Sequence, residues 1–217
     1  MANYVRNVLE VTGNKRVLDF FDFVQNEKGD FDFNKIIPMP ESLNMTSGTS
    51  EIRAVWYFCQ KNNAQIPPYL GGYYEKSIED FESKLKPGEA ELLLKDGEKY
   101  MNNHAKYGYT SWYFWCSKNW GTKWNACESK SEKLSRPALG KFLSVWTFDT
   151  AWEAPEPIFK ELARKFPDLE FKMVSANEDF GCPVSVMTGK NGETEIYYIG
   201  GGEGEEIASE LFGIIQD

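Results

Sequence analysis

Residues 111–126 read SWYFWCSKNWGTKWNA and hold four of the seven tryptophans in this chain of 217 residues. Burying an indole removes a large apolar area from water, so a cluster this dense is typical of a core anchor. Gly121 interrupts the run where a helix can end. The spacing predicts a short helix over the first tryptophans, a turn at Gly121 and a strand from Lys123 to Cys127.

Upstream of this stretch, the pattern changes from strand to helix and back. Apolar and polar residues alternate from Val5 to Val11, which predicts a strand ending near Gly13. Apolar residues at helical spacing then predict a helix over residues 17–25. The alternating segment Phe31–Ile36, closed by two prolines, is predicted to be a second strand.

Residues 41–106 differ from both flanks and predict a helical insertion. Ile52, Trp56 and Cys59 share one helical face. Ser77 followed by Asp80 is typical of a helix start. We therefore expect two parts, residues 1–40 with 107–217 as one domain and residues 41–106 as the insertion.

Downstream of the tryptophans, residues 129–137 are polar and are predicted to form a loop. Asn191-Gly192 between two alternating segments is a strong signal for a tight hairpin. The remaining predicted elements are strands at 142–148, 169–173, 184–188 and 194–199, and helices at 158–166 and 203–215.

The order strand-helix-strand, then strand-helix-strand-strand, favours an α+β fold. We expect a ferredoxin-like antiparallel sheet with helices packed on one face, plus the helical insertion.

Three segments resemble the YubB-like family: the opening MANYVRN, the segment FDFNKIIPMP at residues 31–40, and NWGTKWNA at residues 119–126. FDTAWEAP at residues 148–155 is similar to the same family's continuation. The resemblance implies a phage- or plasmid-borne protein with a ferredoxin-like domain. It implies no reaction, because that family is largely of unknown function.

The net charge of -9 is concentrated in residues 141–217, which hold 15 acidic and 6 basic side chains. Such a surface disfavours phosphate and favours a partner with a basic groove, although a solubilising charge gives the same composition. The carboxylates expected to bind a partner are Glu178, Asp179, Glu203, Glu205 and Glu206.

These features lead to a first hypothesis of a non-catalytic protein-binding module, an accessory protein of a phage or plasmid. A nucleic-acid-handling protein has a groove built for negative charge, so an acidic inhibitor of a host defence nucleoprotein, such as a CRISPR-type effector, fits this hypothesis.

A second hypothesis is a single-stranded nucleic-acid binder that uses residues 112–125. Lysines beside aromatic side chains can neutralise a backbone while bases stack. The candidate residues are Asn119, Trp120, Lys123, Trp124 and Asn125. Core anchoring of the tryptophans and hydrogen bonding by the turn's polar side chains are the structural alternatives.

A third hypothesis is a carboxylate-dependent enzyme using Glu178, Asp179, Glu193 and Glu195. The one histidine, His104, has no nucleophile signature beside it, and the four cysteines lack metal-ligand spacing. We therefore assign no catalytic residue, no metal ligand and no cofactor.

The composition is that of a globular protein, with 41% hydrophobic residues. No apolar run approaches the roughly 20 residues that span a bilayer, and the N-terminal residues lack the plan of a signal peptide. We expect a protein of the bacterial cytoplasm that makes no contact with a membrane.

Overall fold

The computed structural model describes residues 3–71, 77–136 and 141–213. The chain divides into two compact units. One unit is Met39–Trp115, and the other joins Met1–Pro38 to Cys116–Asp217. The expected insertion, residues 41–106, lies within the first of these. Each unit is described by itself below.

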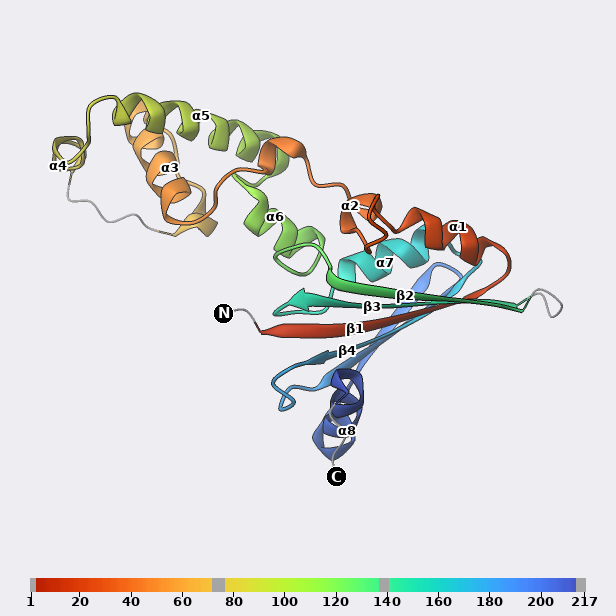
Figure 1. Cartoon of the computed structure of the whole chain (residues 1–217). Helices are drawn as coiled ribbons and strands as arrows, with labels where there is room; N and C mark the ends of the chain where they lie inside the picture. Colours follow the sequence, from red (N-terminus) through yellow and green to blue (C-terminus); the bar gives the residue numbers. More distant parts are fainter. Residues whose placement is uncertain (1–2, 72–76, 137–140, 214–217) are drawn as a thin grey trace. The chain divides into compact units, whose positions relative to one another are not determined.

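The second unit is built on a six-stranded sheet whose spatial order is β2-β3-β1-β4-β5-β6 (Figure 1). Every pair of neighbouring strands is antiparallel. The strands are β1 (Tyr4–Gly13), β2 (Cys127–Arg136), β3 (Lys141–Ala151), β4 (Glu170–Asn177), β5 (Val184–Lys190) and β6 (Glu193–Ile199).

Four of these strands and two helices form the ferredoxin-like arrangement that the sequence predicts. In chain order they are β1, α1 (Arg16–Phe23), β2, β3, α7 (Glu156–Lys165) and β4. In space the strands run β2-β3-β1-β4, so β1 lies between β3 and β4. The predicted α+β class and ferredoxin-like sheet are confirmed.

Aromatic side chains hold α1 and α7 against one face of the sheet, as predicted. The Phe20 ring of α1 lies 5.7 Å from the Phe171 ring of β4, and Phe21 lies 4.9 Å from Trp146 of β3. Phe159 of α7 contacts the same Phe171 at 6.3 Å. Because these rings are buried, the two helices and the strands β3 and β4 share one hydrophobic core.

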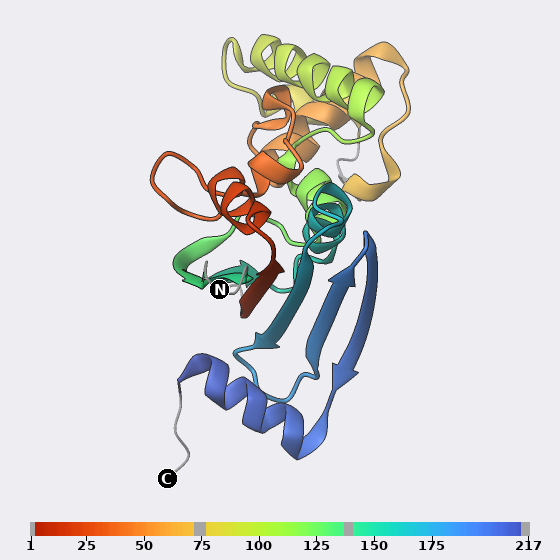
Figure 2. The same ribbon diagram turned by 90° about the vertical axis from the view of Figure 1, so that its right-hand side faces the viewer.

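The opposite face of the sheet receives the last helix, α8 (Gly201–Phe212) (Figure 2). Ala208 of α8 packs with Ala176 of β4 and Val186 of β5, and Ile207 and Leu211 lie against this cluster. These strand residues alternate with the ones that face α1 and α7, so they point to the other side. Ile214, also predicted to face inward, lies outside the described residues.

The segment predicted as a second strand, Phe31–Ile36, is instead mostly the short helix α2 (Phe33–Ile36). Asp32 caps it, because its side chain accepts a hydrogen bond from the backbone N–H of Asn34. Phe33 and Ile36, three residues apart, are both buried. Alternation over so short a segment fits a strand and one helical turn equally well, and the cap decides for the helix.

The strand predicted from Lys123 to Cys127 is also wrong, as is the loop predicted for residues 129–137 where the structure describes it; Pro137 lies outside the described residues. Residues 123–126 are irregular, and the strand β2 runs from Cys127 to Arg136. β2 is an edge strand that pairs with β3 alone. Polar side chains are common on an edge strand, so its composition resembled that of a loop.

The hairpin between β5 and β6 turns at Asn191 and Gly192, as the sequence predicts. Their φ angles are 55° and 81°. Two consecutive positive φ values are required by the tight turn that matches the twist of two antiparallel strands, and Asn-Gly adopts them readily.

The unit Met39–Trp115 is helical among its described residues. Its helices are α3 (Thr49–Asn62), α4 (Ile78–Ser83) and α5 (Glu89–Tyr107), with short 3-10 turns η1 (Glu41–Leu43) and η2 (Pro68–Leu70); α6 (Trp112–Asn119) begins within it. Ser77 caps α4 by accepting a hydrogen bond from the N–H of Asp80, as predicted.

A buried carboxylate, that of Glu51, lies in the first turn of α3. Glu51 is 1% exposed and accepts hydrogen bonds from the Ser47 hydroxyl, the Gly48 N–H and the Thr110 hydroxyl. A buried charge is tolerated when donors surround it, so these contacts give Glu51 a structural role.

The two long helices, α3 and α5, approach each other at Gly97. A methyl group at this position would lie 2.5 Å from the carbonyl oxygen of Ala54 in α3. Only a residue without a side chain permits this approach.

Gly97→Ala is expected to lower the free energy of unfolding by about 1–3 kcal/mol because the helices must move apart. The control is Gly202→Ala in α8, where the added methyl meets nothing within 4 Å. That substitution is expected to stabilise by about 0.5–1 kcal/mol through helix propensity. Urea denaturation measures both, and equal effects at the two positions would contradict the close approach.

Candidate acidic end and tryptophan-lysine surface

Five carboxylates predicted to bind a partner lie at one end of the sheet. Glu178 and Asp179 follow the end of β4, and α8, which carries the other three, follows the end of β6. Because β5 is antiparallel to both β4 and β6, the ends of these two strands lie at the same end of the sheet. We call this set the acidic end; its members are Glu178, Asp179, Glu203, Glu205 and Glu206.

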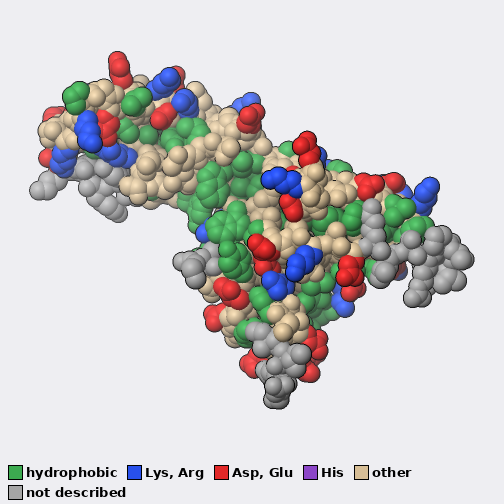
Figure 3. All heavy atoms as spheres, viewed as in Figure 1, with side chains coloured by type: hydrophobic (Ala, Val, Ile, Leu, Met, Phe, Trp, Pro, Cys, Tyr) green, Lys and Arg blue, Asp and Glu red, His purple; other side chains and the backbone are tan. Residues whose placement is uncertain are grey.

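All five carboxylates of the acidic end are exposed. Figure 3, viewed as Figure 1, shows acidic side chains gathered over the region of α8. None of them forms an ion pair within the part of the chain that the structure describes. Glu178 accepts a hydrogen bond from the Tyr4 N–H at 3.0 Å, which fixes the loop on β1. α8 contains no basic residue. The negative charge therefore stays available to solvent or to another molecule.

Trp120, one of the residues predicted to bind nucleic acid, is 3% exposed. Its indole N–H donates to the carbonyl oxygen of Ile37 at 2.9 Å, and its ring meets Phe33 edge-on at 5.7 Å. A ring held in this way offers no face for a base to stack on. Trp120 thus belongs to the core, which corrects its assignment as a binding residue.

Asn125 is also occupied by the fold. Its side-chain oxygen accepts from the N–H of Phe33 at 2.8 Å, and its amide donates to Asp32 at 2.6 Å. These bonds join the segment before β2 to the start of α2. Asn119 is the half-buried last residue of α6. The oxygen and the amide nitrogen of the Asn125 side chain are therefore both hydrogen-bonded within the fold.

Lys123 and Trp124 do reach the surface, where a tryptophan missed by the sequence prediction joins them. The Lys123 ammonium lies 4.2 Å from the Trp124 ring centroid and 5.7 Å from that of Trp152. Trp152 is 49% exposed and has a φ of 71°, which is rare for a bulky residue. We call Lys123, Trp124 and Trp152 the tryptophan-lysine surface.

Thr122 attaches this surface to the end of β3. Its hydroxyl donates to the Ala151 carbonyl at 2.9 Å and accepts from the Ala151 N–H at 3.1 Å. Trp152 follows Ala151 directly and stands before the prolines that begin α7. A tryptophan in the loop between a strand and a helix was the sequence signal for this site.

The structure does not assemble the carboxylate centre proposed for an enzyme. Glu193 and Glu195 lie at the start of β6, beside Lys190, whereas Glu178 and Asp179 follow the end of β4 at the other end of the sheet. In residues 3–71, 77–136 and 141–213 no cluster of three or more histidines, cysteines or carboxylates could hold a metal ion.

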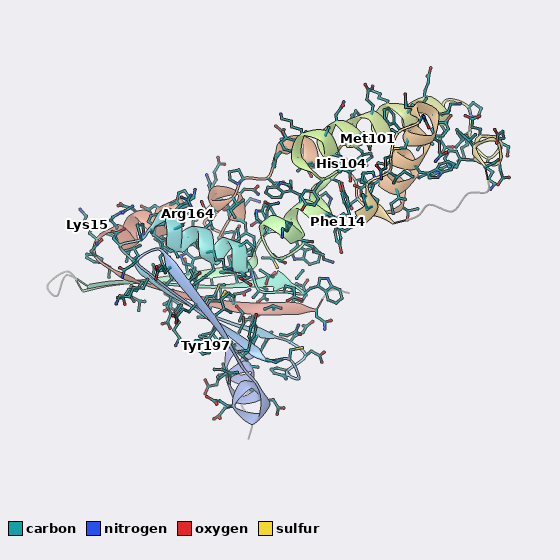
Figure 4. The ribbon with its side chains drawn as sticks, turned by 180° about the vertical axis from the view of Figure 1, so that it is seen from behind. Lys15, Met101, His104, Phe114, Arg164 and Tyr197 are labelled. Carbon is teal, nitrogen blue, oxygen red and sulfur yellow. The ribbon has the colours of Figure 1, made fainter. Side chains whose placement is uncertain are left out.

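His104 lies near the end of α5 (Figure 4). Its Nδ1 is 3.2 Å from the Tyr69 hydroxyl and 3.1 Å from the Gly108 carbonyl oxygen. The Tyr69 hydroxyl in turn accepts from the N–H of Thr110. These contacts order the turn after α5.

No disulfide joins any two of the four cysteines, all of which lie in the described part of the chain. Burial raises the pKa of the Cys116 thiol to about 12 and also raises that of Cys59. Cys182 is exposed.

Part of the chain matches a known family model. Residues 119–216 match the model described as "Ferredoxin-like domain in Api92-like protein". The description names a fold and no activity. The matched segment covers β2 to α8, which are the strands and helices that carry the acidic end.

The chain is similar to a solved structure, the crystal structure of protein api92 from Yersinia pseudotuberculosis. Its identity is 10%, the alignment covers 93% of this chain and 99% of that one, and the TM-score is 0.44. A similarity this low adds nothing to the fold described above. No protein of curated function matches the sequence.

Among the described residues, no helix has the length and apolar character needed to span a bilayer.

Trp120→Ala is expected to lower the free energy of unfolding by about 3–5 kcal/mol, because it empties a core position and removes a hydrogen bond. Trp124→Ala serves as the control and is expected to cost less than about 1 kcal/mol. Thermal denaturation compares the two. Equal losses would place both indoles in the same environment and contradict the assignment.

Brief treatment with iodoacetamide near about pH 8 is expected to modify Cys182 first, since the thiolate is the reacting form and Cys182 is exposed. Cys116 is expected to react only after denaturation. Peptide mapping by mass spectrometry measures the order of modification. Early reaction at Cys116 in the folded protein would show that its thiol is accessible.

Proposed function

We propose that this chain is a non-catalytic protein-binding module that docks its acidic end on a partner with a basic surface. The single observation that supports the proposal is that five exposed carboxylates with no ion pair among the described residues share one end of the sheet. Like charges placed together raise the local potential and speed association with an oppositely charged surface.

The partner best suited to this charge is a protein that handles nucleic acid, because its groove is built to bind a polyanion. In this proposal the chain is an accessory protein of a phage or plasmid that acts in the bacterial cytoplasm. Inhibition of a host defence nucleoprotein, such as a CRISPR-type effector, is the specific form that the proposal takes. The acidic end then occupies the site that nucleic acid would use.

The proposal is tested by affinity capture from bacterial lysate with three versions of the protein. The first is the unchanged chain, and the second carries Glu203→Lys, Glu205→Lys and Glu206→Lys. The third, a matched control, carries Glu27→Lys, Glu91→Lys and Glu98→Lys, which are exposed carboxylates elsewhere. Both variants change the net charge equally, so the comparison isolates position from total charge.

We expect the unchanged chain and the matched control to retain the same partner, and the acidic-end variant to bind it at least about tenfold more weakly. Binding should weaken as NaCl rises from about 0.05 M to about 0.5 M, because salt screens exposed charges. Thermal denaturation verifies folding. Equal retention by all three proteins would refute the acidic end as the docking surface.

A second candidate function, single-stranded nucleic-acid binding, now depends on the tryptophan-lysine surface in place of Trp120. The exposed Trp152 beside Lys123 is the observation that favours it. Trp152→Ala should then weaken binding of a fluorescent oligonucleotide without lowering the melting temperature. If the unchanged chain binds no oligonucleotide at low salt, this candidate is excluded.

A further inference from the structure

A row of three buried polar side chains crosses the helix-facing side of the sheet. Asn7 of β1 pairs in register with Ser175 of β4, which pairs with Ser185 of β5, which pairs with Tyr198 of β6. Asn7, Ser175 and Ser185 are 0%, 3% and 8% exposed. Most side chains on this face of the sheet are apolar, so three neighbouring buried polar side chains need an explanation.

Each of the three side chains keeps an oxygen without a hydrogen-bond partner among the described residues. The Asn7 amide donates to the carbonyls of Val5 and Phe148 and to the Thr150 hydroxyl, but its Oδ1 accepts nothing. The Oγ atoms of Ser175 and Ser185 are likewise unpaired. A buried polar atom without a partner destabilises the fold, and such an atom often marks a place where another molecule binds.

Two members of the row, Ser175 and Ser185, line a cleft of about 320 Å³. A volume of this size accommodates a small molecule or one long side chain. Its other walls come from strand β5, the loop after β3, the loop between β4 and β5, and strand β6. They include Trp152, Glu153, Cys182, Met187 and Tyr198.

The walls of the cleft have the chemistry that binds a cation. Among the described residues no basic side chain lines it, whereas two carboxylates, Glu153 and Glu156, do. Glu156 lies in the first turn of α7, where it offsets the helix dipole, and it pairs with Lys160. Glu153 is exposed and forms no ion pair within the described part of the chain.

Aromatic rings complete this environment, because Trp152 and Tyr198 are 49% and 68% exposed. Ring faces attract ammonium groups, and Lys123 already lies 5.7 Å from the Trp152 centroid. The unpaired hydroxyl oxygens of Ser175 and Ser185, which line the cleft, can accept hydrogen bonds. A ligand that donates several N–H bonds and carries positive charge matches these features together.

We propose that this cleft binds an alkylammonium group. The ammonium donates to the unpaired oxygens of Ser175 and Ser185, its aliphatic chain lies along Met187 and the aromatic walls, and Glu153 supplies the opposite charge. This site is separate from the acidic end and goes beyond docking on a basic surface.

The first test is calorimetric titration of the full chain with n-pentylamine, n-pentanol and valerate, which share a chain length and differ in charge. We expect the amine to bind at least about tenfold more tightly than the alcohol, and valerate not to bind. Equal binding of amine and alcohol, or no binding of the amine, overturns the proposal, and the cleft then holds only water.

The second test uses variants of the cleft. Ser185→Ala and Glu153→Gln are each expected to weaken the amine about fivefold or more. Ser144→Ala is the matched control, because Ser144 is also buried with an unpaired hydroxyl but does not line the cleft. Since the Ser185 hydroxyl has no hydrogen-bond partner in the described part of the chain, its loss should leave the melting temperature unchanged or higher. Unchanged affinity in folded Ser185→Ala and Glu153→Gln would refute the site.

Two sources could supply an alkylammonium group, a free amine or a lysine side chain of a protein partner. Titration with Nα-acetyl-lysine methylamide distinguishes them. Affinity equal to or above that of pentylamine identifies a protein lysine, and weaker affinity identifies a free amine. The acidic-end variant, with Glu203→Lys, Glu205→Lys and Glu206→Lys, should bind pentylamine as tightly as the unchanged chain does. Amine binding in the cleft can therefore be confirmed or refuted whether or not the acidic end docks on a partner.

Discussion

Side-chain alternation along the central strand β1 is the constraint on which this architecture depends. Leu9 and Val11 point to the face covered by α1 and α7, while Arg6 and Val8 point to the other face. β1 pairs with β3 on one side and with β4 on the other. Its register with them therefore determines which side chains of all three strands point to each face of the sheet. The aromatic core, the position of α8 and the polar row all follow from that register.

How much of this could be read from the sequence depended on the length of each pattern. The strand that begins near Val5 and the hairpin at Asn191 and Gly192 carry long or specific signals, and both were predicted. The segment Phe31–Ile36 was predicted wrongly because a single cap, Asp32, decides between strand and helix. β2 was missed because its polar composition reflects an edge position, which depends on the topology of the whole sheet.

The sites were harder to predict than the fold, for a related reason. The exposure of the glutamates on α8 follows from helical position and could be anticipated. The burial of Trp120 depends on a carbonyl 83 residues away, that of Ile37. The meeting of Asn7, Ser175 and Ser185 depends on the register of β1 against β4 and β5, which lie far from β1 in the chain. No local pattern encodes such a row.

The loop between β4 and β5 links the two proposed sites. Its first residues, Glu178 and Asp179, belong to the acidic end, and its last, Cys182 and Pro183, line the cleft. The backbone N–H of Tyr4 bonds Glu178, so the loop is held on β1. A basic surface seated on the acidic end would therefore lie along the loop that also borders the cleft. If the amine in the cleft is a partner's lysine, one docking event would fill both sites and satisfy the unpaired serine hydroxyls.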